Sequence, residues 1–454
     1  MSASPNPQGD ELLAIAERVA TQAKKGELIE AYVGRASDTH VRTYAGEVEQ
    51  LESAQSQGIG VRVVVDGRTG FAYAGTLDAD AIADVLAEAR DNASFGTPDE
   101  FAGLAEPDGV PTADLDLWND QLASLPTEQK IAMTLELEKL TAASDPRITV
   151  ESADYSDVLA EGAIASSIGM RGYGRETGCY VMVSTLATQG NETQTGYGYS
   201  VGRGAGEIDI TKAAADAVDR ATRLLGATKP QSGRVNVVFD PMVSAQFLRI
   251  LSSALNGEAV LKGRSFLADR LGDEIASPLL TLIDDPTDPR AFSATTLDGE
   301  GLATRRNMLI DKGVLQMFVH NSYSARRAGT RSTGSAVRGG FKGTPGVGCI
   351  ALQIAPGAGT QADLVRHAGD GILVQSVSGM HSGVNPVSGD FSTGASGLLI
   401  RNGELGGPVR EFTIASTIQK MLKDISAVGA DVDWLPSGTA GVSLVVRDVT
   451  MSGS

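Results

Sequence analysis

Hydrophobic residues recur with two different spacings in the first hundred residues. Residues 12–20 have the spacing of a helix, and short apolar or alternating segments typical of strands follow as far as Tyr73. Asp66 and Gly67 form a strong hairpin signal between two of these segments. A second helical stretch covers about residues 78–89. This order predicts a helix, an antiparallel sheet and a second helix.

The same order of elements returns after residues 95–126, a segment rich in Pro, Gly and Asp. Helical spacing at residues 131–140 is followed by four strand-like stretches between residues 148 and 201, and then by a helix over about 211–225. No shorter period of 20–50 residues is present, so the pattern is consistent with an internal duplication and not with a solenoid.

These patterns predict an α+β protein of two domains. The C-terminal half contains mostly short strands, with helices expected at about residues 242–255 and 414–425, so it should be mainly antiparallel β. The expected divisions are a disordered N-terminus (1–9), an N-terminal α+β domain (10–230) with two similar helix–antiparallel sheet–helix units (10–95 and 127–228), and a C-terminal domain (231–452).

The charge balance excludes two classes of partner. Lys and Arg number 38 against 56 Asp and Glu, which gives a formal net charge of −18. A nucleic-acid binder or a protein bound to anionic membranes needs a basic face, so neither is expected. The two cysteines cannot form a disulfide framework, and no apolar run is long enough for a membrane span. We expect a soluble, cytoplasmic protein.

The histidines and cysteines show no metal-binding pattern. None of the four histidines has a partner four residues on, and no C-x-x-C is present, so we expect no metal on this chain. We expect most of the histidines to be structural, and Cys179 and Cys349 to be buried, inert thiols. His381, within the Gly- and Ser-rich residues 378–388, is the best histidine candidate for contacting a ligand.

Two other features have both a functional and a structural interpretation. Gly198–Gly202 matches G-x-S-x-G, but a serine-hydrolase elbow needs a helix directly after Ser200, and a Gly-rich loop follows instead. Residues 326–343 form a basic island, which could bind an anionic group or could be structural; we favour the structural interpretation. The island contains Arg326, Arg327, Arg331, Arg338 and Lys342 and no acidic residue.

The C-terminal half resembles the TldD/PmbA family, specifically its PmbA (TldE) branch. The resemblance covers roughly residues 232–452 and rests on several separate motifs. They are Leu297–Gly301 with Arg305-Arg306, Gly313–Leu315, Asn321–Arg326, Ser332–Ala336, Asn385–Ser392 and Leu398–Gly403.

The resemblance also shows what is missing. TldD-like members bind zinc through a helical H-E-x-x-x-H motif and a later cysteine. Here Gly257 and Lys262 take the two histidine positions, only Glu258 remains, and residues 436–440 lack the cysteine. Glycine has no ligand atom and an ammonium has no lone pair, so these residues cannot hold a catalytic zinc. Glu258 is expected to be structural, paired with Lys262 or Arg264.

The family implies that this chain is the metal-free subunit of a heteromeric zinc metallopeptidase that acts on unfolded peptides, with zinc on a TldD-like partner. An extended peptide could add as a strand to an open sheet edge. The alternatives are an independent hydrolase using Ser200, or Glu258 with His381, and a non-enzymatic peptide-binding module. Candidate substrate-binding residues are His381, Asn385, Asp390, Phe391, Arg305 and Arg306.

Overall fold

The computed structural model describes residues 7–454. Helix α1 (Pro7–Ala20) already includes residues 7–9, so the prediction of disorder is wrong for these three residues, while residues 1–6 lie outside the described part. No helix within residues 7–454 is long and apolar enough to cross a membrane.

The N-terminal half forms one antiparallel six-stranded sheet in the order β3-β2-β1-β4-β5-β6. Each predicted unit contributes three strands, and β1 and β4 join the units at the centre of the sheet. The expected sheets are therefore one continuous sheet. The strands are β1 (Glu27–Tyr44), β2 (Glu47–Val65), β3 (Arg68–Ala74), β4 (Ile148–Ser166), β5 (Arg171–Gln189) and β6 (Glu192–Gly202).

Several of these strands are longer than the sequence pattern predicts. β1 has 18 residues and β2 has 19, whereas the sequence pattern predicted only short segments in this part of the chain. Most of residues 47–57 are exposed, so this half of β2 lacks the alternation of buried and exposed positions by which a strand is recognised. The predicted Asp66-Gly67 hairpin is confirmed, and both residues have positive φ, 48° and 72°.

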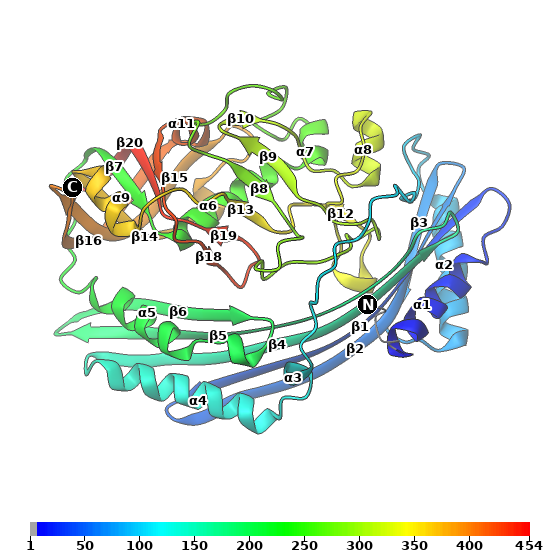
Figure 1. Cartoon of the computed structure of the whole chain (residues 1–454), viewed down its shortest axis with the longest axis horizontal. Coiled ribbons are helices and arrows are strands. Elements are labelled where there is room, and N and C mark those ends of the chain that lie inside the picture. The colour runs from blue at the N-terminus through cyan, green and yellow to red at the C-terminus, as the bar shows by residue number, and fades with distance from the viewer. Residues whose placement is uncertain (1–6) are drawn as a thin grey trace.

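Helices cover the convex face of the curved sheet, and the C-terminal domain lies over its concave face (Figure 1). Helices α1 and α2 (Ala79–Phe95) cover one apolar cluster, and α4 (Thr127–Ser144) and α5 (Ile210–Thr222) cover another. Gly198 of β6 lets α5 approach closely, because a Cβ there would lie 1.8 Å from the Ala213 carbonyl oxygen. The predicted linker, residues 95–126, is irregular except for α3 (Asp120–Ala123) and Phe95, the last residue of α2.

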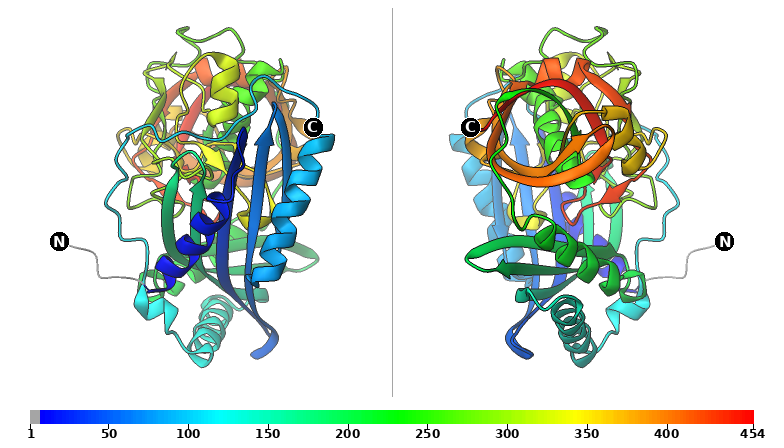
Figure 2. Two further views of the ribbon diagram at one scale, coloured as in Figure 1. Left: turned by 90° about the vertical axis from the view of Figure 1, so that its right-hand side faces the viewer. Right: turned by 90° about the vertical axis from the view of Figure 1, so that its left-hand side faces the viewer.

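The C-terminal domain is built around a small closed barrel. Its strands follow the order β16-β15-β14-β7-β20, and pairing of β16 with β20 closes the ring seen in Figure 2. β17 (Ile425–Val428) extends it beside β20. The sheet is mainly antiparallel, but β14 runs parallel to β7. The barrel strands are β7 (Gly233–Phe239), β14 (Gly371–Ser378), β15 (Asp390–Arg401), β16 (Glu404–Thr417) and β20 (Leu444–Ser452).

A second C-terminal sheet has the order β10-β9-β8-β13-β19-β18, and β11 pairs with β12. The helix expected over residues 414–425 is shorter, α11 (Ile418–Lys423), because residues 414–417 continue β16. The remaining strands are β8 (Leu282–Asp284), β9 (Asn307–Asp311), β10 (Val314–Leu315), β11 (Ala336–Val337), β12 (Gly346–Val347), β13 (Leu352–Ile354), β18 (Asp433–Trp434) and β19 (Ala440–Gly441). The helices are α6 (Pro241–Ala254), α7 (Gly257–Leu261), α8 (Ser322–Ala328), α9 (Gln361–Ala368), α10 (Met380–Gly383) and α11.

Buried charges join the two domains. Arg62 of β2 donates to Glu30 of β1 at 2.6 Å and lies 3.6 Å from Glu300 of the C-terminal domain. Arg338, from the same domain, also pairs with Glu30. Burial alone would raise the pKa of Glu30, but the charges of Arg62 and Arg338 lower it. The two domains therefore share one network of four buried charged side chains.

The basic island is used inside the molecule. Arg326 donates to the carbonyl oxygens of Phe101, Gly103 and Leu104, which fixes the linker against α8. Arg338 belongs to the buried network. The structural interpretation is confirmed for these two arginines.

We predict that Arg62→Met destabilises the protein by about 3–5 kcal/mol, because Glu30 and Glu300 would lose a buried counter-charge. The free energy of unfolding from urea denaturation measures this. Arg171→Met is the control, since Arg171 pairs with Glu17 on the surface and should cost less than about 1 kcal/mol. Equal effects of the two substitutions would contradict the importance of the network.

Candidate functional site

The degenerate zinc motif lies on the one-and-a-half turns of α7. The Asn256 side chain caps this helix by accepting hydrogen bonds from the backbone N–H groups of Glu258 and Ala259. Lys262 Nζ lies 2.5 Å from Glu258 Oε1, so the predicted pairing of these residues is confirmed. Glu258 therefore already has a cationic partner, Lys262, which caps the C-terminal end of the same helix.

His320 occupies the space in front of Gly257. A Cβ built on Gly257 would lie 2.1 Å from His320 Cε1, far closer than two carbon atoms can approach without a bond. The imidazole is buried, and its Nδ1 lies 3.1 Å from Ser324 Oγ. Burial lowers the pKa of His320, so the ring is neutral at pH 7. His320 is a structural histidine, as predicted, and it closes the position of the first zinc ligand.

These residues do not fit a zinc ion. Position 257 has neither a donor atom nor room for one, and the Lys262 ammonium is held by Glu258. Across residues 7–454, no group of three or more His, Cys, Asp or Glu side chains is arranged to hold a metal.

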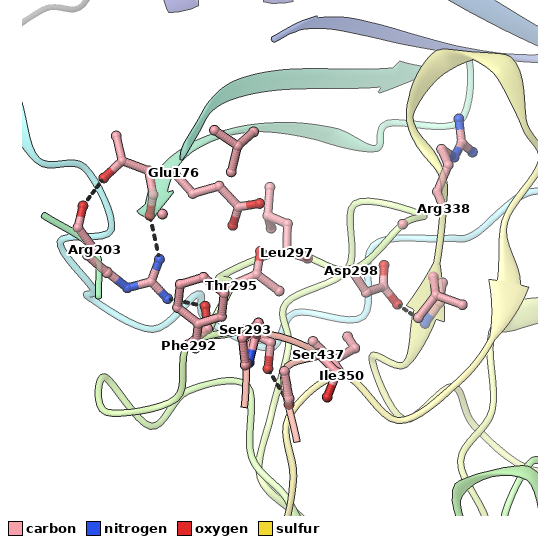
Figure 3. A pocket seen from close by; sticks show the side chains of 18 of the residues that line it. Glu176, Arg203, Phe292, Ser293, Thr295, Leu297, Asp298, Arg338, Ile350 and Ser437 are labelled. Carbon is pink, nitrogen blue, oxygen red and sulfur yellow. Dashed lines mark hydrogen bonds between the residues drawn. The ribbon is translucent and has the colours of Figure 1, made fainter. Parts of the chain in front are cut away.

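A cavity of about 430 Å³ lies between the concave face of the N-terminal sheet and the C-terminal domain (Figure 3). β1, β4 and β5 supply one wall, the loop of residues 292–299 supplies another, and Ser437 also lines the cavity. Val337 and Ser437 are exposed, so the cavity is open to solvent there. Its lining includes Tyr32, Val158, Glu176, Arg203, Phe292, Leu297, Asp298, Arg338, Ile350 and Ser437.

Two carboxyl groups in this cavity have different surroundings. Asp298 accepts hydrogen bonds from the backbone N–H groups of Glu300, Leu302 and Ala336 at 2.9–3.1 Å. Burial and the charge of Glu300 nevertheless raise the pKa of Asp298 to about 7. Burial also raises the pKa of Glu176, and the charge of Arg203 opposes that shift.

A second cavity, of about 730 Å³, lies along one face of α6 and contains His381. Gln246, Arg249 and Ser253 project from α6, and Met380 and Val384 lie opposite in and after α10. Pro436 and Ser437 line both cavities, so this segment lies between them. The structure therefore places His381 in a partly apolar groove, where it can be reached by a ligand.

The other predicted substrate-binding residues are not gathered at one site. Asn385 accepts hydrogen bonds from the backbone N–H groups of Val387 and Ser388, and Asp390 accepts one from the Ser388 hydroxyl, so both shape their own loop. Phe391 is buried against Phe247 in the main core. The prediction that Phe391 contacts substrate is wrong, because an aromatic residue at the start of β15 points into the barrel core.

Arg305 and Arg306 serve structural ion pairs. Arg305 lies 2.7 Å from Asp108 of the linker, and Arg306 lies 3.4 Å from Asp285. Neither arginine lines either of the two cavities described above.

Ser200 is not a hydrolase nucleophile. It lies in the edge strand β6, and α5 begins only at Ile210, so the strand–turn–helix elbow is absent from this segment. The Ser200 hydroxyl accepts a hydrogen bond from the backbone N–H of Asp209 at 2.9 Å. The alternative pair, Glu258 and His381, is not brought together either, because Glu258 does not line the groove that contains His381.

Three residues that line the interdomain cavity were missed by the sequence reasoning. Glu176, Arg203 and Phe292 lie in separate segments without a motif. On β5, Gly174, Glu176 and Gly178 alternate along one face, so one acidic side chain lies among glycines on the concave face. This alternation is the sequence feature from which a site at Glu176 could have been predicted.

Comparison with known proteins identifies the same family along most of the chain. Residues 29–93, 120–225 and 232–453 match the family descriptions PmbA/TldA metallopeptidase domain 1, central domain and C-terminal domain. The chain is 28% identical to Metalloprotease PmbA of Escherichia coli O157:H7 over 97% of this chain and 95% of that protein. It is 27% identical to the Metalloprotease PmbA homolog of Haemophilus influenzae over 97% of this chain and 96% of that protein.

The crystal structure of TldE from Thermococcus kodakarensis has the same fold. The TM-score is 0.89 at 24% sequence identity, and the match covers 98% of this chain and 99% of that one.

The contact between Gly257 and His320 predicts a steric penalty. Gly257→Ala should destabilise the protein by about 1–3 kcal/mol, because the added methyl group forces the buried imidazole to move. Urea denaturation measures this. Gly174→Ala is the control, since a Cβ there meets no atom within 4 Å, and should change stability by at most about 0.5 kcal/mol. In a His320→Ala background the penalty at position 257 should shrink; an unchanged penalty would contradict this assignment.

Asp298 should give the folding stability a pH dependence. Its pKa in the folded chain, about 7, lies above the ordinary value of 3.8. Between about pH 4 and pH 7 the folded chain therefore binds a proton that the unfolded chain has released, so this contribution to stability is lost as the pH rises. Asp298→Asn removes it. The free energy of unfolding should decline less from pH 5 to pH 8 in this variant than in the wild type, and an equal decline would contradict the raised pKa.

Proposed function

The chain belongs to the PmbA/TldD metallopeptidase family, and on that premise we propose that it is the metal-free, TldE-like subunit of a heteromeric zinc metallopeptidase. Its role is to complete the chamber that holds an unfolded peptide, while a TldD-like partner supplies the zinc and the catalytic base. We place this assembly in the cytoplasm.

One observation supports the metal-free role most strongly. Position 257 has a buried imidazole packed against it, so it lacks both a ligand atom and the space for one. A catalytic zinc needs three protein ligands, and Lys262 and the segment at Ser437 supply neither of the other two. This chain therefore depends on a companion for peptide hydrolysis.

The N-terminal sheet supports the proposed binding of unfolded peptides. β3 pairs with β2 only from Ile59 to Val65, so residues 48–58 of β2 have no outer neighbour strand among the described residues. Most of this stretch is exposed, and its backbone N–H and C=O groups on that edge are free to pair with an extended chain. Such pairing recognises the peptide through backbone hydrogen bonds, so it suits an unfolded substrate of any sequence.

Co-expression with a TldD-like subunit tests the proposal. The co-purified complex should cleave an unstructured peptide and contain zinc, whereas this chain alone should do neither. Metal analysis and mass spectrometry of the products measure both properties. The matched control is a complex in which the first zinc-binding histidine of the TldD-like subunit is changed to alanine, and this complex should be inactive. Stoichiometric zinc and equal cleavage by the isolated chain would refute the proposed role.

The steric closure at position 257 also predicts the outcome of an attempted repair. The double substitution Gly257→His and Lys262→His should not produce stoichiometric zinc binding, because His320 blocks position 257 and no third ligand is present. Metal analysis after dialysis against zinc measures this. Zinc binding by the double variant would show that the site has been misread.

A further inference from the structure

One carboxylate in the interdomain cavity has no partner in contact with it. Glu176 lines the cavity of about 430 Å³ and also an adjoining cavity of about 140 Å³, so its side chain lies where the two meet. Figure 3 shows this side chain inside the cavity, on the side of Leu297. Within residues 7–454, the Glu176 carboxylate has no hydrogen-bond donor and no ion-pair partner within 4 Å.

The cationic residues of the cavity are engaged elsewhere. Arg203 donates to the carbonyl oxygens of Thr177, Ala291, Phe292 and Ala294 at 3.1–3.3 Å, which holds the loop of residues 291–294 against β5. Arg338 pairs with Glu30 and stacks over Tyr32. Neither guanidinium is in contact with Glu176, although the charge of Arg203 acts on it from a longer distance.

The other acid of the cavity is satisfied by the protein itself. Three backbone N–H groups bind the two oxygens of Asp298, so its hydrogen-bonding capacity is largely used. A partly buried carboxylate without such donors costs free energy unless a ligand or water supplies them. Glu176 is therefore the carboxylate in this cavity that is available to a ligand.

The surroundings of Glu176 suit a cation on an apolar stem. Phe292, Leu297, Val158 and Ile350 line the same cavity, and a volume of about 430 Å³ is within the range of small ligand sites. A lysine or arginine side chain places its methylene groups on apolar surface and its charge on a carboxylate. The amino-terminal residue of a peptide presents the same combination of ammonium and side chain.

We propose that the interdomain cavity binds a cationic group of a peptide, with Glu176 as its counter-ion. The cationic group is either the amino-terminal ammonium or a lysine or arginine side chain. This inference deepens the proposed function, on which the link to peptide substrates rests. It assigns to this subunit a role in selecting substrates, because peptides with a cation at the matching position would bind more tightly.

Direct binding to the isolated, full-length chain tests this inference without the partner. The probes are four unstructured ten-residue peptides of Gly, Ser, Ala and Leu, each with a fluorophore at its C-terminus. One has a free amino terminus and no basic residue. The other three are acetylated and contain lysine, arginine or norleucine at one central position. Fluorescence anisotropy gives the dissociation constants.

At least one cationic peptide should bind about tenfold more tightly than the acetylated norleucine peptide, as expected for one charge-assisted hydrogen bond. The comparison of the three cationic peptides identifies which cation the cavity takes. In Glu176→Gln this preference should disappear, while thermal unfolding shows that the variant is folded. Glu151→Gln, a substitution of an exposed residue on β4, is the control and should keep the full preference.

Equal affinity for the cationic and neutral peptides, or a preference that survives Glu176→Gln, would overturn the inference. Failure to bind any of the four peptides at millimolar concentration would overturn it as well, since the cavity would then hold only water. Neither result bears on cleavage by the complex with a TldD-like subunit. The proposed function can therefore stand when this inference fails. Peptide binding by the isolated chain can likewise be measured when the complex does not cleave.

Discussion

The buried charges of Glu30, Arg62, Glu300 and Arg338 constrain how the two domains can meet. Each of these side chains would be strongly disfavoured in an apolar environment without the others. Glu30 and Arg62 come from neighbouring strands of the N-terminal sheet, and the other two come from the C-terminal domain. The domains can thus be buried against each other only in an arrangement that brings all four together, which fixes the position of the C-terminal domain on the concave face.

The interdomain cavity follows from this arrangement. Arg338 belongs to both the charge network and the cavity wall, and Asp298 is two residues from Glu300, so the same segments that hold the domains together also line the cavity. On the opposite wall, the long strands β4 and β5 present mostly small residues around Glu176. The ion pairs hold the C-terminal segments in place on one side, and the small side chains of the sheet leave space on the other. Neither domain would enclose this space alone.

The sequence allowed prediction of features that depend on neighbouring residues. The Asp66-Gly67 hairpin and the pairing of Glu258 with Lys262 depend on a few neighbouring residues each, and both could be predicted directly. Features that depend on distant segments could not. The length of β2 was missed because its outer half is exposed and lacks alternation. Glu176 was missed because it lines a cavity only where Arg203 and the loop of residues 292–299 come next to it in the folded chain. Phe391 was misassigned because its neighbours in sequence are polar although it faces the core.

The packing of His320 against Gly257 leaves no room for a larger side chain at position 257. An unfilled space beside Gly257 would be destabilising, because the surrounding buried side chains would lose packing contacts. Here an imidazole from another segment fills the space and is itself held by Ser324. Because of this packing, a larger side chain at position 257 would clash with the buried imidazole of His320. The fold therefore keeps position 257 without a side-chain donor atom.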